Sequence, residues 1–215
     1  QKDRNTDDVY LGYSSPKTPS RVYAYNLTNK SKKLVKEQEI PSGHNPDDYI
    51  VERVEYKSHD GRLIPLTITR HKKTKIDGSA NLLLYGYGSY GNSMSPSFSS
   101  TKLSLIDRDI IWATAHIRGG MEKGMKWWKE GKLTNKKNTF EDYIHAAKYL
   151  IDNKYSSKGK IIGMGGSAGG LLMGAVVNQA PELFLGIIMA VPFVDSLTTN
   201  LDHSLPLTVG EFDEF

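Results

Sequence analysis

The sequence has 215 residues, of which 38% are apolar and 24% charged, a composition typical of globular domains. No apolar run reaches the ~18 residues that a membrane-spanning helix needs, and no secretory signal is visible, so we expect no membrane association. The absence of cysteine excludes disulfides and thiolate metal ligands, and it is compatible with the reducing cytoplasm, where we expect the protein.

The net charge of +4 is unevenly distributed. Lys160 is the last basic residue, so residues 1–160 carry 28 basic and 18 acidic side chains, whereas residues 161–215 carry six acidic ones. A basic segment can bind nucleic acid, but these lysines are scattered through predicted turns and helix faces, which is typical of a solvated surface. We therefore expect no nucleic-acid partner.

The first 46 residues have a β-like pattern. Apolar and polar residues alternate over 9–13, 21–25 and 33–35, with turn-forming stretches at 14–20 and 26–31 between them. Three short antiparallel strands are too few to close a core. Residues 42–46 have the composition of a linker, so a second unit is expected to begin after them.

From residue 47 the pattern becomes that of an α/β protein. Strands are predicted at 52–58 and 63–70, joined by an Asp60-Gly61 hairpin turn. Near-continuous apolar strands at 81–85 and 110–117 indicate a sheet covered on both faces. An amphipathic helix is predicted over 139–152, with Thr139 as its N-cap, and a further strand over 187–191. Strands that alternate with helices indicate an α/β sheet.

The motif GGSAGG at residues 165–170 is predicted to be a nucleophile elbow. An apolar strand at 160–164 precedes it and an apolar helix follows over 171–179, which is the context that gives the pattern G-x-S-x-G its meaning. The glycines are expected because the turn strains the Ser167 backbone and leaves no room for side chains two residues away. A glycine-rich turn without chemistry is the alternative interpretation.

Several segments together resemble the prolyl oligopeptidase family of serine peptidases, and within it the oligopeptidase B branch. These segments are residues 84–91, 116–120, 136–140, 165–170, 178–184 and 206–212. The resemblance implies that residues 1–46 are the last part of a β-propeller with its linker. It also implies that residues 47–215 are the first part of an α/β-hydrolase domain, whose catalytic Asp and His lie further along the chain.

By the same resemblance, Ser167 is the nucleophile of an acyl-enzyme mechanism. The tetrahedral oxyanion needs donors placed in advance, and the N–H of Ala168, the residue after the nucleophile, is one of them in this architecture. The family implies that the hydroxyl of Tyr87 is the second donor. The alternative for Tyr87 is an aromatic side chain that packs at the end of a strand.

The family also implies that Glu211 lies at the floor of the first specificity pocket. Asp213 is expected nearby, on the same side of an extended segment, and Tyr90 is expected to line the pocket. A carboxylate in a partly dry pocket favours a guanidinium or ammonium group, so cleavage of short peptides after Arg or Lys is predicted. Glu211 and Asp213 as ordinary surface acids are the alternative. No cofactor or metal ion is expected.

Three positions depart from the family pattern. Ser95 and Ser97 stand where bacterial oligopeptidase B has two aspartates that serve a second basic subsite, so a preference for paired basic residues is not predicted. Met121 stands where a glycine is common.

After Ser167 the chain offers only Asp195, Asp202 and His203 as an acid and a base, and the spacing is too short for the later strands. Of the earlier histidines only His116 lies near the predicted site. We therefore expect the 215-residue chain alone to be inactive, since a serine without its histidine loses on the order of 10⁶ in turnover. An esterase or acylaminoacyl hydrolase with the same elbow, and a non-catalytic module, are the competing hypotheses.

Overall fold

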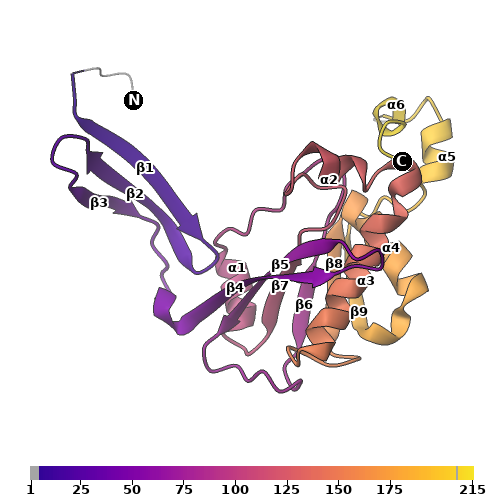
Figure 1. The fold of residues 1–215 in the computed structure, drawn as a ribbon, viewed down its shortest axis with the longest axis horizontal. Helices are drawn as coiled ribbons and strands as arrows, with labels where there is room; N and C mark the ends of the chain where they lie inside the picture. Colours follow the sequence, from indigo (N-terminus) through magenta and orange to yellow (C-terminus); the bar gives the residue numbers. More distant parts are fainter. Residues whose placement is uncertain (1–4, 207) are drawn as a thin grey trace.

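The computed structural model describes residues 5–206 and 208–215, and it contains two β-sheets (Figure 1). The strands are β1 (Asp8–Ser15), β2 (Thr18–Asn26), β3 (Lys32–Glu37), β4 (Tyr49–Lys57), β5 (Leu63–His71), β6 (Leu82–Tyr85), β7 (Ile111–Ala115), β8 (Ile161–Gly166) and β9 (Phe184–Ala190). The helices are α1 (Ser100–Ile106), α2 (Met125–Lys129), α3 (Lys137–Asp152), α4 (Ala168–Gln179), α5 (Ser196–Leu201) and α6 (Thr208–Glu211), with 3₁₀ turns at Pro46–Asp48, Leu133–Asn135 and Pro181–Leu183.

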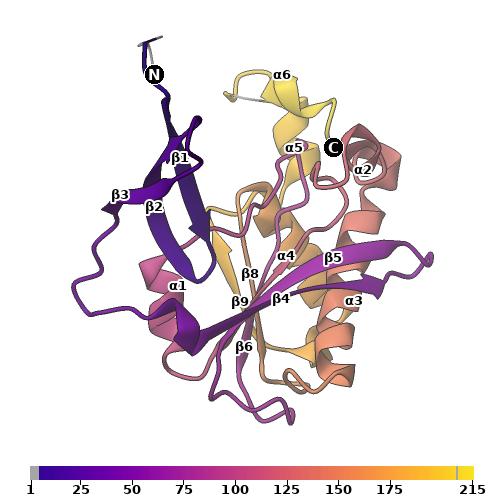
Figure 2. The same cartoon turned by 60° about the vertical axis from the view of Figure 1, so that its left-hand side comes forward.

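The N-terminal sheet is antiparallel, in the order β1-β2-β3, as the alternating pattern predicts. The predicted turn at 14–20 is wrong in its extent, because Ser15 pairs with Thr18 and only two residues separate the strands. This sheet stands apart from the main one in both views (Figures 1 and 2). It leaves Tyr10, Tyr13 and Val35 largely exposed.

The main sheet has six strands in the order β4-β5-β7-β6-β8-β9. The last four in this order, β7, β6, β8 and β9, are parallel to one another. The predicted hairpin joins β4 and β5. Alternate side chains of β6 face opposite layers. Leu82 and Leu84 belong to the larger core cluster, which includes buried residues of α3 and α4, whereas Leu83 packs with Ile106 of α1 in a second cluster. The α/β prediction is therefore confirmed.

Several predicted boundaries are wrong. Strand β4 begins at Tyr49 and helix α4 at Ala168, each three residues before the predicted start. The helix α3 begins at Lys137, and Lys136 rather than Thr139 occupies the N-cap position. Thr139 is completely buried and its hydroxyl donates to the carbonyls of Arg118 and Gly131, at 2.9 and 3.1 Å, so it ties the helix to loops instead of capping it. Strand β9 begins three residues before the predicted start because Phe184 already pairs with Ile161 of β8.

In the part of the chain that the structure describes, no helix is long and apolar enough to cross a membrane. Leu207, which belongs to the predicted motif at 206–212, lies outside the described residues.

Candidate active site

The predicted site lies at the carboxyl edge of the parallel strands, where loops from neighbouring strands converge. Strand β6 leads into residues 86–91, β7 into residues 116–120, and β8 directly into Ser167. Ligand sites of open α/β sheets form outside the carboxyl ends of their strands. Helices α2, α5 and α6 lie at the same end of the main sheet (Figures 1 and 2).

Ser167 has the backbone conformation of a strained elbow, with φ 55° and ψ −120°. Its N–H donates to the carbonyl of Ala190 at 2.9 Å, and its own carbonyl accepts from the N–H of Phe193 at 3.0 Å. The last residue of β9 and the loop after it therefore hold the strained residue by its N–H and its carbonyl. The side chain itself is exposed, as a nucleophile requires.

The flanking glycines are required by close backbone approach. A Cβ on Gly165 would stand 2.2 Å from the carbonyl oxygen of Gly169, and a Cβ on Gly169 would stand 3.0 Å from the carbonyl oxygen of Gly86. Real Cβ atoms do not approach backbone atoms as closely as the first of these distances. The steric reason predicted for the G-x-S-x-G pattern is thus present.

Tyr87 lies beside Ser167. Burial raises the pKa of the half-buried Tyr87, against the opposing effect of the Asn92 and Ser167 side chains, which lie close enough to interact with its hydroxyl. Ala168 is the first residue of α4, and its N–H belongs to the first turn, whose donors a helix leaves free. The structure therefore brings Tyr87, Ala168 and Ser167 together. Asn92 was not identified from the sequence.

Tyr90 connects this group to Glu211. Its hydroxyl donates to Glu211 Oε2 at 2.5 Å, and its ring centroid lies 6.3 Å from that of Tyr87. Burial, followed by the hydrogen bond to Glu211, raises the pKa of Tyr90. Its φ of 57° lies in the left-handed region, which a tyrosine rarely adopts. Phe215 packs edge-on against the Tyr90 ring, with 5.8 Å between the ring centroids.

The structure places Asp213 differently from the prediction. The segment is not extended, since α6 ends at Glu211 and a turn follows, with the N–H of Glu214 bonded to the Glu211 carbonyl at 3.0 Å. In this turn Asp213 is exposed and Glu214 is buried. Sequence reasoning missed Glu214. The signal that could have found it is its position three residues after Glu211, which a helical turn brings to the same side.

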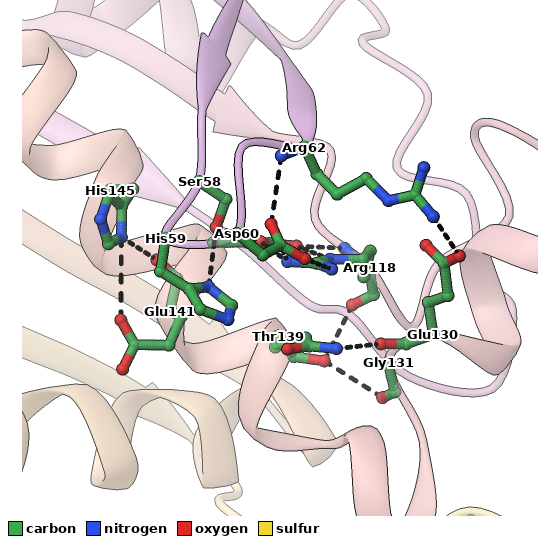
Figure 3. Close-up of polar contacts among 12 residues, drawn as sticks. Ser58, His59, Asp60, Arg62, Arg118, Glu130, Gly131, Thr139, Glu141 and His145 are labelled. Carbon is green, nitrogen blue, oxygen red and sulfur yellow. Dashed lines mark hydrogen bonds and ion pairs between the residues drawn. The ribbon is translucent and has the colours of Figure 1, made fainter.

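Arg118 of the motif at 116–120 is 1% exposed and lies in a network of buried polar groups (Figure 3). Its guanidinium donates to both carboxylate oxygens of Asp142, at 2.9 and 2.6 Å, and to Asp60 at 2.6 Å. Ser58 donates to the same Asp142 carboxylate at 2.6 Å. Burial by itself lowers the pKa of Arg118, but its hydrogen bonds to Asp142 and Asp60 and their charges outweigh this effect and raise that pKa.

This network supports the loop that carries Tyr87 and Tyr90. Gly119, with φ 96°, accepts a hydrogen bond from the N–H of Gly91 at 2.9 Å, and a Cβ on Gly119 would stand 1.9 Å from the carbonyl oxygen of Gly88. Met121 packs against Gly91, where its Cε lies 2.6 Å from the position of an added Cβ. Residues 118–121 therefore pack against the loop and hold its backbone in place.

Among the described residues, none of the six histidines has a hydrogen bond to Ser167. His116 is buried and its Nε2 bonds the hydroxyl of Thr67 at 2.8 Å. His203 packs against Phe212. The side chain of Asp195 caps α5 by accepting from the N–H of Thr198 at 3.1 Å.

A serine at a strained strand-to-helix turn, with prearranged donors beside it, is typical of serine-dependent hydrolases with an α/β sheet. The sequence profile described as the prolyl oligopeptidase family matches residues 96–215. The chain belongs to this family.

Similar proteins cover nearly all of this chain. It is 47% identical to the dipeptidyl aminopeptidase BI of Pseudoxanthomonas mexicana, over 98% of this chain and 29% of that protein. It is 42% identical to the protease 2 of Moraxella lacunata, over 98% of this chain and 31% of that protein. It superposes on the solved structure of oligopeptidase B from Leishmania major with a TM-score of 0.90 and 42% identity, over 99% of this chain and 30% of that one. The chain thus spans about a third of the length of these relatives.

Proposed function

We propose that this chain is the part of a serine peptidase that contains the nucleophile and the specificity carboxylate, and that the enzyme hydrolyses short peptides after Arg or Lys. The observation that carries the proposal is the continuous set of contacts from Ser167 through Tyr87 and Tyr90 to Glu211. The Glu211 carboxylate thus lies two aromatic rings away from the serine of the strained turn.

The domain assignment that fits this function divides the chain at residue 46. Residues 1–46 would be the last part of a β-propeller, which agrees with a small antiparallel sheet that stands apart from the main one. Residues 47–215 would be the first part of an α/β-hydrolase domain, which agrees with the order of the six strands and the elbow after β8. The remainder of the parent chain would supply the catalytic Asp and His.

In the proposed reaction the Ser167 oxygen attacks the peptide carbonyl and loses its proton to the base. The N–H of Ala168 and the Tyr87 hydroxyl stabilise the negative oxygen of the tetrahedral intermediate. The C–N bond then breaks and the amine leaves with that proton. Water hydrolyses the remaining ester and releases Ser167.

The preference for Arg or Lys follows from the way in which the Glu211 carboxylate is held. Oε2 accepts from the Tyr90 hydroxyl, which fixes the carboxylate, and a guanidinium can bond in the plane of the same carboxylate. The rings of Tyr90 and Phe215 suit the aliphatic stem and the flat cation of an arginine side chain. Asp213 is exposed, so its contribution is the long-range attraction of a surface charge. With Ser95 and Ser97 in place of acids, a second basic residue is not required.

Replacing Tyr87 with phenylalanine is expected to lower kcat about 10²–10³-fold with little change in KM, because one oxyanion donor is lost while the ring stays. Steady-state hydrolysis of an arginine amide by the full-length peptidase measures this. Tyr85→Phe is the matched control, since Tyr85 stacks on Trp112 and is not a proposed oxyanion donor. An equal fall in both variants would contradict the role of the Tyr87 hydroxyl.

Replacing Glu211 with glutamine is expected to weaken transition-state binding of arginine amides by about 2–5 kcal/mol, because the substrate cation loses its partner. A neutral ester should be hydrolysed as before. The ratio of kcat/KM for the two substrates measures the effect, and Glu182→Gln, an exposed acid, is the control. Equal losses on both substrates would favour the esterase or acylaminoacyl hydrolase hypothesis.

Release of dipeptides is a second candidate function, because the relative with 47% identity is named a dipeptidyl aminopeptidase. Matched peptides with a free and with an acetylated N-terminus distinguish the two. An endopeptidase cleaves both, whereas a dipeptidyl peptidase cleaves only the free one.

A further inference from the structure

A buried ion pair joins the segments that form the proposed pocket. Lys136 and Glu214 are 8% and 2% exposed, and Lys136 Nζ lies 3.5 Å from Glu214 Oε1. Neither residue contacts Ser167 in the described part of the structure, and the chemistry proposed above uses neither. A buried pair of this kind calls for an explanation, because removing two charges from water costs more than their attraction commonly returns.

The ammonium group of Lys136 binds the loop after β6. Nζ donates to the carbonyl of Gly88 at 2.8 Å and to the hydroxyl of Ser89 at 2.5 Å. With Glu214 as the third partner, its three protons have three acceptors. Burial lowers the pKa of Lys136 to about 8, against the opposing effect of Glu214. The loop held in this way is the one that contains Tyr87 and Tyr90.

The carboxylate of Glu214 binds the same loop from the other side. Its Oε1 accepts from the N–H of Tyr90 at 2.9 Å, and its Oε2 accepts from the indole N–H of Trp128 at 2.8 Å. The Glu214 carbonyl accepts from the N–H of Leu133 at 2.9 Å, which fixes the backbone three residues after Glu211. The pair therefore joins three segments, namely residues 88–90, 128–136 and 211–214.

From these contacts we infer that Lys136 and Glu214 are positioning residues for the recognition of a basic side chain, acting through Tyr90 and Glu211. The Tyr90 hydroxyl meets Glu211 only while both segments keep their register, and the pair holds both. Lys136 also neutralises Glu214, so that Glu214 does not compete with Glu211 for the substrate cation. This inference rests on the proposed function of the same site.

The test uses Lys136→Met and Glu214→Gln in the full-length peptidase. We expect KM for an arginine amide and Kd for benzamidine, a small aromatic cation, to rise about 10–100-fold, since misplacement by 1 Å can cost that much. We expect kcat on a neutral ester and the rate at which a fluorophosphonate labels Ser167 to fall much less, because the pair bonds residues 88–90 and makes no bond to Tyr87 itself. A merely structural role would move all four readouts together.

Matched controls are Lys137→Met, the exposed neighbour of Lys136, and Glu182→Gln. The wild-type enzyme is assayed first. If it does not cleave after Arg or Lys, the proposed function fails. If it does, and the two variants bind benzamidine like wild type, only the positioning role is overturned.

Should Lys136→Met and Glu214→Gln fail to fold, Ser89→Ala decides the question, because it removes one acceptor of Lys136 and leaves both charges. A raised Kd for benzamidine supports the inference and an unchanged one overturns it.

Discussion

Substitution of Ser167 by alanine is expected to lower turnover of the full-length peptidase by about 10⁶ and to abolish labelling by a fluorophosphonate. The reason is that no covalent acyl-enzyme can form. The fold should be unaffected, because the hydroxyl is exposed and alanine adopts the positive φ of this position no worse than serine. Hydrolysis of an arginine amide, and mass spectrometry of the labelled peptide that contains residue 167, measure both effects.

The control for this substitution is Ser42→Ala, at an exposed serine of the segment between the two sheets. It should keep full activity and labelling. Retention of activity by Ser167→Ala would place the nucleophile elsewhere. Absence of labelling in the wild-type enzyme would favour the hypothesis of a non-catalytic module.

The elbow could be predicted because its constraints are local. Strand, turn and helix follow one another within twenty residues, and the glycines are required by contacts between neighbours in the sequence, such as Gly165 with Gly169. The parallel strands could be predicted for a similar reason, since both faces of β6 and β7 are covered and their residues are almost all apolar.

Short helices could not be predicted. Helices α1, α2, α5 and α6 have four to seven residues, which is too few for an apolar period of 3.6 to be recognised. The error at Asp213 has the same origin. In an extended segment Asp213 would lie on the same side as Glu211. Because a four-residue helix and a turn stand there instead, Glu214 is buried and Asp213 is exposed.

Contacts between distant residues left no trace in the sequence. Arg118 and Asp142 are 24 residues apart, and Arg118 and Asp60 are 58 apart. The motif at 116–120 indicated the family, but nothing in it showed that its arginine is a buried support for the site. Burial of a charged group is decided by tertiary packing, which no local pattern encodes.

The second large effect is a loss of stability, expected when the buried Arg118 loses its partner Asp142. Replacing Asp142 with alanine is expected to lower the free energy of unfolding by about 3–5 kcal/mol, because the Arg118 guanidinium would remain buried without its main partner. Ser58 and the backbone N–H of Arg118, which also donate to Asp142, would lose their acceptor. The midpoint of urea unfolding, measured at neutral pH, checks this expectation.

The neighbouring pair of Arg62 and Glu130 is the matched control (Figure 3). Its N···O distance of 2.6 Å equals the shortest one between Arg118 and Asp142, but the Arg62 side chain is 47% exposed. Arg62→Gln should therefore cost at most about 1 kcal/mol. Equal losses in both variants would contradict the view that burial decides the outcome.

The isosteric variant Asp142→Asn separates the effect on stability from the effect on the site. It keeps the shape of the side chain but reduces its attraction for Arg118, whose neighbour Gly119 holds the loop of Tyr87 through Gly91. We expect kcat to fall at temperatures where the variant is still folded, because the Tyr87 hydroxyl, the proposed oxyanion donor, moves with that loop. Unchanged kcat in the folded variant would limit Arg118 to a role in stability.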